Sequence, residues 1–505
     1  MTPIGATVEA LLDSIPGSTL IGRPDAWVSG VRNDSRLVQP GELFAALRGG
    51  DFDGHAFAAD AAQRGAAALL VETAVDVPLP QIVVPDSRAA LAKAAATIFG
   101  HPSRSIGVIG ITGTDGKTTT AHLVDHILRD RGLRTGMVGT VAIRIGREED
   151  HHASRQTTPE SSDIQRYLRQ MVDAEADWAV LEATSHGLAM HRLDEVWFRI
   201  GAVTNVTHEH LDFHGTREAY LRAKAILLER VGAAGGIAVV NTDDPGALAV
   251  APFAAGATVV SYSPSGGDAG LRAVDVRCHA TGSRFMLDAG DLGRVAIKLP
   301  MIGEFNVANA LCAAGVALAA GVDLEEIAAA LAVAPSVPGR MALVEIGQPF
   351  SVIVDYAHTP DALEKVLRLL RTLHPAGRLI VVFGSAGERD IQKRPVQGRV
   401  AATLADVSVV TSEDPRFEDA DAIIAQIAAG AEAAGAVMGE TLFTRTDRRE
   451  AIRHAIGLAR PGDCVLLAGK GHEGSIIWGR DKVPWDEAAV AREVLTEAGY
   501  ERLRG

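Results

Sequence analysis

Gly110-Ile111-Thr112-Gly113-Thr114-Asp115-Gly116-Lys117-Thr118-Thr119-Thr120 is the stretch from which the fold of this 505-residue chain is most directly inferred. It follows an apolar run over residues 106–111, which predicts a buried parallel strand. After it, apolar residues recur at helical spacing until Gly132, which predicts a helix that ends there. The stretch therefore predicts a strand, a glycine-rich turn and a helix N-terminus in succession.

Such a turn is suited to binding phosphate. Free backbone N–H groups and the positive end of the helix dipole both face the turn and favour an anion there. Lys117 would neutralise the β- and γ-phosphates of a nucleotide, and the hydroxyl of Thr118 would bind Mg²⁺. Gly113 and Gly116 are closer together than in the usual phosphate-binding loop, so a plain glycine-rich turn is the alternative. The strand–turn–helix context favours the nucleotide site.

Composition limits the class of protein. The chain is too long for one hydrophobic core, and the length predicts about three domains. Its net charge is −14, from 63 acidic and 49 basic residues, so we expect no nucleic-acid partner. The three cysteines, Cys278, Cys312 and Cys464, match no zinc or redox spacing, which favours the cytoplasm.

No segment of the sequence predicts export or membrane insertion. The N-terminus lacks the basic flank and apolar core of a signal peptide. Pro245–Gly267 is uncharged over much of its length, but prolines and glycines interrupt it, and we expect a loop and a strand. Phe305–Val322 contains asparagines and many alanines, and we expect a buried helix. We therefore expect no membrane span.

Alternation of apolar strands with helical patterns predicts an α/β protein of three domains. Residues 1–102 predict a small N-terminal α/β domain, and residues 103–337 a central parallel sheet covered by helices. Residues 338–505, after a hinge at Pro338-Gly339-Arg340, predict a Rossmann-like doubly wound domain. Folds of this kind bind ligands at the carboxyl ends of their strands, so polar residues there are candidates for the site.

Two polar segments follow strands of the central region. Glu182 directly follows the predicted strand over 178–181, which suits Mg²⁺, a cation that prefers oxygen ligands. Residues 204–215 contain His208, His210 and His214, which could suggest zinc, although a polar loop with hydrogen-bonded histidines is favoured. Lys224 falls on a predicted helix, and by its spacing alone it would be a solvated surface lysine.

Taken together, the motifs resemble a known family. The order of G-T-D-G-K-T, E-A-T-S-H, T-N-V-T-H-E-H-L-D-F-H-G and A-Y-L-R-A-K resembles the Mur ligases of peptidoglycan synthesis. These are ATP-dependent amide ligases that share a three-domain plan with folylpolyglutamate synthetase. D-S-R at 34–36, T-T-P-E at 157–160, G-E-F-N-V-A-N at 303–309 and G-K-G-H-E at 469–473 extend the resemblance over nearly the whole chain. Within the family it is closest to the branch that adds the third residue of the stem peptide to UDP-N-acetylmuramoyl-L-alanyl-D-glutamate.

The resemblance implies roles for particular residues. For ATP it implies the loop residues together with four others: Gly113, Thr114, Asp115, Gly116, Lys117, Thr118, Thr119, Asn306, Arg340, Asp355 and His358. For the UDP substrate, bound partly by a uridine-binding N-terminal domain, it implies Ser35, Arg36, Thr157, Thr158, Ser185 and Arg192. Asp115 stands where most relatives have asparagine, which places a negative charge near the phosphates.

The resemblance also changes the interpretation of Lys224. In Mur ligases the lysine of this helix is usually carbamylated to N6-carboxylysine, which turns a cation into an anionic oxygen ligand. The implied Mg²⁺ ligands are then Thr118, Glu182, His210 and modified Lys224, and the implied catalytic residues are Lys117, Glu182, His210 and Lys224.

The third domain is implied to bind the incoming amino acid through Arg389, Asp414, Arg416, Gly469 and Glu473. Relatives that add meso-diaminopimelate usually have D-N-P-R where this chain has E-D-P-R at 413–416. Arg416 favours diaminopimelate, because a guanidinium can bind its second carboxylate in a bidentate manner. Asp414 favours L-lysine or L-ornithine, because a carboxylate there prefers an ammonium group. We expect meso-diaminopimelate, with the other two as alternatives.

The implied reaction begins with activation of a substrate carboxylate by ATP to an acyl phosphate, which the amine of the amino acid then attacks. Lys117 and Mg²⁺ would screen the repulsion between carboxylate and γ-phosphate. We expect a monomer whose third domain closes about the Arg340 hinge. The alternatives are a divergent Mur or folylpolyglutamate-type ligase and a non-catalytic nucleotide-binding protein.

Overall fold

A computed structural model of the chain describes residues 4–49, 52–146, 148–151, 156–207 and 211–500. The chain forms two compact units. The first comprises Met1–Asp275, Phe285–Ile297 and Val307–Leu331, and the second comprises Val276–Arg284, Lys298–Asn306 and Ala332–Gly505.

The N-terminal part of the first unit is a small α/β sandwich. Its sheet has the order β2 (Thr19–Ile21), β7 (Gln81–Val83), β6 (Ala68–Val71), β5 (Leu43–Ala45) and β4 (Val31–Arg32). Only β2 runs antiparallel to its neighbour. Helices α1 (Val8–Ser14) and α3 (Ser87–Ile98) bury Leu11 and Leu91 against one face, and α2 (Ala58–Gln63) packs Ala61 on the other.

The central sheet of the first unit is built around β8 (Gly107–Thr112), all of whose residues are buried. Parallel neighbours flank it on both sides, β12 (Trp178–Glu182) on one and β13 (Ile200–Val203) on the other. Beyond β13 the sheet continues in parallel through β14 (Ile237–Asn241), β15 (Thr258–Ser263) and the start of β16 (Leu271–His279). Strands β17 (Gly282–Asp288) and β18 (Arg294–Leu299) follow in the chain.

The opposite edge of this sheet adds two antiparallel strands to the predicted parallel sheet. There β9 (Thr135–Val138) pairs in parallel with β12, but β10 (Ala142–Ile145) and β11 (Glu148–His151) add an antiparallel hairpin. A tight return after β9 replaces the helical crossover that another parallel strand would require.

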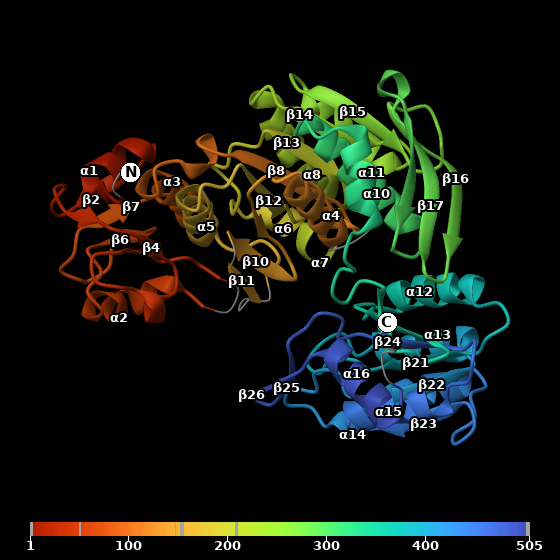
Figure 1. Cartoon of the computed structure of the whole chain (residues 1–505). Helices are drawn as coiled ribbons and strands as arrows, with labels where there is room; N and C mark the ends of the chain where they lie inside the picture. Colours follow the sequence, from red (N-terminus) through yellow and green to blue (C-terminus); the bar gives the residue numbers. More distant parts are fainter. Residues whose placement is uncertain (1–3, 50–51, 147, 152–155, 208–210, 501–505) are drawn as a thin grey trace. The chain divides into compact units, whose positions relative to one another are not determined.

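Helices cover the central sheet (Figure 1). The long ones within the first unit are α4 (Lys117–Asp130), α5 (Ser161–Asp173), α8 (Arg217–Ala233) and α11 (Leu324–Ala332). Helix α10 (Glu304–Ala319) confirms the helix predicted within Phe305–Val322. Residues 245–250 form helix α9 (Pro245–Val250), where only a loop and a strand were predicted, because Asp244 caps this helix and Pro245 fits its first turn. Among the described residues, no helix is long and apolar enough to cross a membrane.

The second unit contains a doubly wound sheet. Its order is β19 (Ala342–Leu343), β20 (Ser351–Asp355), β24 (Cys464–Ala468), β21 (Leu379–Phe383), β22 (Val407–Thr411) and β23 (Leu442–Arg445). All pairs are parallel except β19 with β20. Its two central strands, β24 and β21, are apolar throughout because helices cover both faces.

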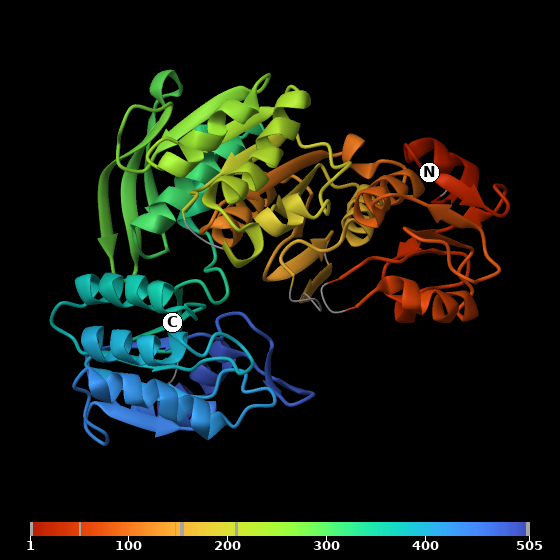
Figure 2. The same cartoon turned by 180° about the vertical axis from the view of Figure 1, so that it is seen from behind.

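Alternate strand residues of the second unit pack on opposite helical layers. Ile353 packs toward α12 (Pro360–Leu373), α13 (Lys393–Leu404) and α14 (Ala420–Ala433), which Figure 2 shows from behind. Val352 packs toward α15 (Arg448–Leu458) and α16 (Glu487–Glu497). The carboxyl ends of the strands are therefore left to loops.

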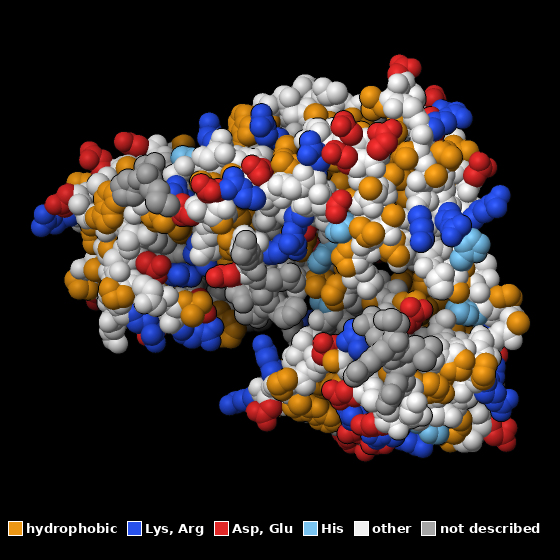
Figure 3. Space-filling view, viewed as in Figure 1, with side chains coloured by type: hydrophobic (Ala, Val, Ile, Leu, Met, Phe, Trp, Pro, Cys, Tyr) orange, Lys and Arg blue, Asp and Glu red, His pale blue; other side chains and the backbone are white. Residues whose placement is uncertain are grey.

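On the face shown in Figure 3, acidic and basic side chains of the described residues are interspersed.

Candidate functional site

The phosphate-binding loop has the predicted local structure. Strand β8 ends at Thr112 and α4 begins at Lys117, with Gly116 as its left-handed N-cap at φ 84°. A Cβ atom on Gly116 would lie 2.3 Å from Asn309 Oδ1, and one on Gly113 would lie 1.8 Å from Thr204 Oγ1. A side chain at either position would strain the backbone and displace a neighbouring side chain, whereas glycine lets the loop backbone approach an anion closely.

Contacts within the loop place its cation and fix its backbone. Lys117 Nζ donates to the carbonyl oxygens of Gly113 and Thr114, at 2.8 Å each, so the ammonium group lies over the loop. Asn205 Oδ1 accepts from the N–H of Asp115 at 2.9 Å, while the Asp115 side chain is exposed. Solvent therefore screens the carboxylate that stands where relatives have asparagine.

Glu182 lies at the centre of a buried cluster of oxygen atoms. It is 2% exposed, and its Oε2 accepts from Thr118 Oγ1 at 2.9 Å and from Thr140 Oγ1 at 3.0 Å. The N–H of Thr140 donates to Glu182 Oε1 at 2.7 Å. Carboxylate and hydroxyl oxygens beside a phosphate loop are the donors that Mg²⁺ prefers, so the predicted pair of Thr118 and Glu182 fits this cation.

Lys224 is buried, which makes its interpretation as a surface lysine wrong. On helix α8 it is 1% exposed, its Nζ donates to Gly113 O at 2.6 Å, and it lies 4.6 Å from the centre of the Tyr220 ring. A lysine head group held against the phosphate loop is in a position to act on the same ligand as Lys117. The predicted ligand His210, with its neighbour His208, lies outside the described residues.

The residues predicted for the muramoyl peptide gather next to this cluster. Thr157 Oγ1 accepts from Thr140 Oγ1 at 3.0 Å, and Thr158 Oγ1 donates to Glu182 O at 2.8 Å. Arg192, which is 8% exposed, donates to Thr158 O at 3.0 Å. Ser185, buried as well, is the first residue of α6 (Ser185–Ala189), directly after β12. Hydrogen bonds thus link Thr157, Thr158 and Arg192 to Glu182, directly or through one intermediate residue, and Ser185 follows Glu182 by three positions in the chain.

The predicted uridine-side residues lie in the N-terminal part of the first unit. Ser35 is buried in a short 3₁₀ helix, Ser35–Leu37, and the Arg36 guanidinium pairs with Asp34 at 2.7 Å. This pairing lowers the pKa of Asp34 below its usual value. Asn33 Oδ1 accepts from Ser162 Oγ at 3.0 Å, which ties this segment to the start of α5.

Sequence reasoning gave no separate role to Thr140, Arg88 or Glu160, although Glu160 ends the T-T-P-E segment. Glu160 accepts from Arg192 Nη2 at 2.9 Å and from Arg88 Nη1 at 3.3 Å. Thr140 follows β9, so the rule that ligands bind at carboxyl ends of strands could have found it. Nothing in the sequence pattern pointed to Arg88, because it reaches Glu160 from the distant helix α3.

In the second unit, the predicted Arg340, Asp355 and His358 surround Tyr356. Arg340 lies 5.0 Å above the Tyr356 ring, and His358 Nδ1 lies 3.0 Å from Tyr356 O. Asp355 accepts from the N–H groups of Met341 and Ala357, at 2.8 Å each, and burial raises its pKa. The structure thus joins the P-G-R turn to the end of β20.

The loops predicted to bind the amino acid are held together by a buried lysine. Lys470, fully buried, donates from Nζ to Asp414 Oδ1 at 2.9 Å and to Glu473 Oε2 at 2.5 Å. Arg416 has φ 56°, and its backbone N–H donates to Ile477 O at 2.9 Å. Sequence reasoning named Asp414, Arg416, Gly469 and Glu473 but not Lys470, whose role depends on burial.

Two further atoms of these loops bear on binding. Among the described residues, Glu413 Oε2 and Arg416 Nε are buried without a hydrogen-bond partner. A Cβ atom on Gly469 would lie 3.3 Å from Glu413 Oε2. Arg389 is exposed, and two residues before it Gly387 donates to Asp414 O at 2.8 Å. The loop after β21 therefore lies beside the other two loops.

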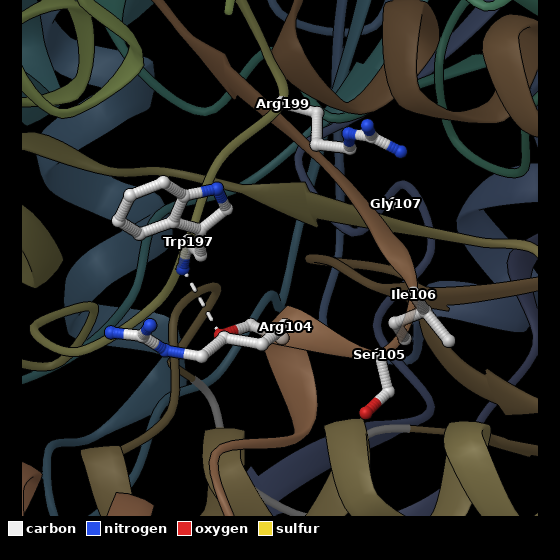
Figure 4. A pocket seen from close by; sticks show the side chains of 7 residues that line it. Arg104, Ser105, Ile106, Gly107, Trp197 and Arg199 are labelled. Atoms are coloured by element: carbon white, nitrogen blue, oxygen red, sulfur yellow. Dashed lines mark hydrogen bonds between the residues drawn. The ribbon is translucent and has the colours of Figure 1, made fainter. Parts of the chain in front are cut away.

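A separate cavity of about 330 Å³ lies at the amino end of β8, lined by residues of 103–107 with Trp197 and Arg199. The phosphate loop follows the opposite end of this strand. Figure 4 shows the Arg199 side chain directed away from Arg104, which lies 5.2 Å from the centre of the Trp197 ring. The lining arginines do not converge, so this cavity is not the nucleotide site.

Family profiles match most of the chain. The profile described as Mur ligase family, catalytic domain, matches residues 28–105, and that of the Mur ligase middle domain matches 111–317. The Mur ligase, glutamate ligase domain profile matches 339–471.

Curated relatives are similar over nearly the full length. A UDP-N-acetylmuramyl-tripeptide synthetase of Roseiflexus sp. (strain RS-1) is 50% identical over 94% of this chain and 95% of its own length. One of the same name from Deinococcus radiodurans is 44% identical over 96% of this chain and 98% of its own length. A UDP-N-acetylmuramoyl-L-alanyl-D-glutamate–2,6-diaminopimelate ligase of Geobacillus kaustophilus is 41% identical over 97% and 99%.

Solved structures support the same assignment. A UDP-N-acetylmuramoyl-L-alanyl-D-glutamate–2,6-diaminopimelate ligase has a TM-score of 0.68 at 30% identity, covering 98% of this chain and 99% of the other. MurF of Acinetobacter baumannii, at 22% identity and a TM-score of 0.68 over 98% of this chain and 99% of its own, shares the fold. The profiles, the full-length relatives and the ligase architecture agree: this chain belongs to the Mur ligase family.

Proposed function

We propose that this enzyme uses ATP to join meso-diaminopimelate to the D-glutamyl γ-carboxylate of UDP-N-acetylmuramoyl-L-alanyl-D-glutamate. The observation that carries the reaction class is the shared cluster in which Glu182 contacts both the phosphate loop, through Thr118, and the T-T-P-E segment, through Thr158. A γ-phosphate in the loop and a carboxylate on the T-T-P-E side would then meet beside Glu182. The names of the relatives support the same substrate.

The first chemical task is to activate a carboxylate that does not react with an amine near neutral pH. Lys117 would leave its loop carbonyls to neutralise the transferring phosphoryl group, and Arg192 would orient the muramoyl peptide. Mg²⁺, held by Thr118 and Glu182 with the proposed carboxylated Lys224 and His210, would supply charge neutralisation at the phosphates. The resulting acyl phosphate is then attacked by the amine of the amino acid, which releases phosphate and forms the amide.

Roles for the three segments follow from this scheme. Residues 1–102, with Ser35 and Arg36, would bind the uridine end of the precursor, and residues 103–337 would bind ATP. Residues 338–505 would bind the amino acid, with Arg340, Asp355 and His358 serving the nucleotide and Asn306 its adenine side. Asn306 Nδ2 donates to Ile302 O at 2.9 Å, which orients its amide.

Arg416 and Lys470 support diaminopimelate. Asp414 would repel the distal carboxylate of this substrate if its charge were uncompensated, but Lys470 pairs with it inside the protein. The buried Arg416 Nε, with no partner among the described residues, belongs to a guanidinium suited to a carboxylate. Lys470 thus allows aspartate to stand where diaminopimelate-adding relatives usually have asparagine.

L-Lysine or L-ornithine is the second candidate, and a charge imbalance favours it. The amino-acid loops contain three carboxylates, Glu413, Asp414 and Glu473, but one buried ammonium is shared between two of them. Glu413 Oε2, unpartnered among the described residues, could accept from a distal ammonium. The two relatives of 50% and 44% identity are also named without an amino acid.

A substrate panel tests the proposal. The purified enzyme is incubated with ATP, Mg²⁺ and UDP-N-acetylmuramoyl-L-alanyl-D-glutamate, and with each of meso-diaminopimelate, L-lysine and L-ornithine in turn. Product is scored by mass, with a folate acceptor in place of the UDP precursor as control. Diaminopimelate should give the highest kcat/KM. Product with lysine or ornithine alone would contradict the amino acid assignment, and no product with any of them would contradict the function.

A further inference from the structure

A fully buried arginine lies behind the amino-acid loops. The side chain of Arg448, the first residue of α15, is 0% exposed. Its Nη1 donates to Ser412 O at 3.2 Å and its Nη2 to Ala468 O at 2.8 Å. Both carbonyls belong to residues at the carboxyl ends of strands, so the guanidinium joins two strand ends.

These two strand ends begin the two loops. Ser412 is the first residue after β22 and precedes Glu413-Asp414-Pro415-Arg416, while Ala468 ends β24 and precedes Gly469-Lys470. The strands are not neighbours, because β21 lies between them in the sheet. Hydrogen bonds between neighbouring strands therefore do not fix one loop directly against the other. The guanidinium of Arg448 supplies a direct link between the two strand ends.

The charge of Arg448 is neutralised by a buried carboxylate outside the two loops. Glu487, whose side chain is also 0% exposed, accepts from Arg448 Nε at 2.9 Å and from Nη2 at 2.7 Å. Trp485 Nε1 donates to Glu487 Oε2 at 2.5 Å. A planar guanidinium can pair with a carboxylate and still reach two carbonyls, which the single ammonium of a lysine cannot do in the same geometry.

We propose that Arg448 is a positioning residue for amino-acid binding, which it serves by fixing the spacing between loop 413–416 and loop 469–473. The inference rests on the proposed function, because those loops are where that function places the amino acid. The bond between Asp414 and Lys470 crosses the same gap, so a change in loop spacing acts on it directly. Arg448 itself contacts no substrate.

The test is the variant Arg448→Lys, which keeps a positive charge beside Glu487. It loses the two separate N–H donors that reach the carbonyls of Ser412 and Ala468. We expect its KM for the amino acid to rise about tenfold, the effect of one lost hydrogen bond from a charged donor. The KM values for ATP and for the UDP precursor should stay within about twofold, because neither ligand contacts these loops in the proposed function. Thermal unfolding is followed in parallel.

The chain offers a matched control at the other end of the same sheet. Arg378 pairs with Asp463 at 2.6 Å and donates to Leu458 O at 2.6 Å, where β21 and β24 begin. Arg378→Lys should lower the unfolding temperature without raising the amino-acid KM. Trp485→Phe removes the N–H that holds Glu487 while keeping an aromatic ring at this position. It should raise that KM by a smaller factor, which keeps the test available if Arg448→Lys does not fold.

The outcomes separate the inference from the proposed function. A selective rise in amino-acid KM for Arg448→Lys or Trp485→Phe, absent in Arg378→Lys, supports it. It is overturned if the folded variants keep the wild-type amino-acid KM, or if Arg378→Lys raises it equally. A wild-type enzyme that consumes no amino acid overturns the proposed function and the inference with it. Wild-type turnover with lysine rather than diaminopimelate leaves the test intact, with lysine as the varied substrate.

Discussion

At the scale of single residues, Lys470 balances the charge of the loops that we propose to bind the amino acid. Its ammonium is fully buried and shared between Asp414 and Glu473, one from each amino-acid loop. Removing one partner of a buried ion pair leaves an uncompensated charge, which is far more unfavourable than the pair itself. The charge state of this cluster therefore depends on a residue that contacts no substrate in our proposal.

The variant Lys470→Met tests this role. With Asp414 and Glu473 uncompensated, the loops should reject a substrate with a distal carboxylate, and kcat/KM for diaminopimelate should fall at least about hundredfold. The ratio of kcat/KM for lysine to that for diaminopimelate should rise. Asp414→Asn is the matched control, since its amide oxygen can still accept from Lys470, and it should retain diaminopimelate use within about threefold. An unchanged substrate ratio in Lys470→Met would contradict the proposed charge balance.

Lys224 is the second residue whose chemistry the fold alters. The Lys224 amine is buried, with Nζ 2.6 Å from Gly113 O of the phosphate loop, and our proposal has it react with CO₂ to form a carbamate that would bind Mg²⁺. That step forms an N–C bond and releases a proton. We expect ¹³C-labelled bicarbonate to give a carbamate NMR signal in the wild type that is lost in Lys224→Met, together with at least about a hundredfold loss of kcat. Lys298→Met, which replaces an exposed lysine, should retain both the carbamate signal and the wild-type kcat. A carbamate signal that persists in Lys224→Met would refute the modification.

At the scale of elements, the phosphate loop is constrained at Gly116. Its positive φ and the 2.3 Å approach to Asn309 mean that a methyl group adds both strain and a clash. We expect Gly116→Ala to raise the KM for ATP or lower kcat by about a hundredfold or more, measured by phosphate release. Gly132→Ala at the other end of α4 is the control, because Gly132 also has positive φ but has open space around its Cβ position. It should lower stability by about 1 kcal/mol and leave ATP use unchanged. Equal kinetic losses in the two variants would indicate general damage to α4.

Elements specified by local pattern are those that could be predicted from the sequence. The strand, glycine turn and helix over 107–130 depend on neighbouring residues, and they form as predicted. The antiparallel hairpin β10–β11 departs from the predicted parallel sheet, because nothing in a short apolar run states which strand it will pair with. Lys224, Lys470 and Arg448 are charged residues whose burial arises from tertiary packing. Each has a partner far away in sequence: Gly113 is 111 positions from Lys224, Asp414 is 56 from Lys470 and Glu487 is 39 from Arg448. These separations are beyond the reach of spacing arguments.

At the scale of the whole molecule, contacts between charged and polar groups tie the N-terminal sandwich to the central sheet within the first unit. Arg88 pairs with Glu160 at 3.3 Å, and Lys93 pairs with Glu195 at 3.2 Å. His191 lies between the same two parts: its Nδ1 is 2.7 Å from Asp194 Oδ2, and its Nε2 is 4.0 Å from Asp86 Oδ2 at the N-cap of α3. Contacts between charged groups therefore help to link the two parts, and the charge of one of these groups, His191, changes near neutral pH.

His191 should make the stability of this unit depend on pH. Its hydrogen bond to Asp194 raises its pKa above the ordinary 6.5, against the opposing effects of partial burial and of Arg230. A raised folded-state pKa gives stability that is fully present below about pH 6.5 and is lost as pH rises through the folded value. His191 has φ 61°, which asparagine tolerates, so His191→Asn removes the titrating group with little added strain.

The wild type should therefore unfold at a higher temperature than His191→Asn at about pH 6, and the difference should shrink toward about pH 9. Because the side chain is 39% exposed, solvent screening limits the contribution to below about 1 kcal/mol. This corresponds to at most about 2–4 °C in unfolding temperature for a domain of this size. The measurement is calorimetry of both proteins across this pH range, with Asp194→Asn as a second variant that removes the partner. A difference that stays constant with pH would show that the imidazolium does not contribute to the stability of this unit.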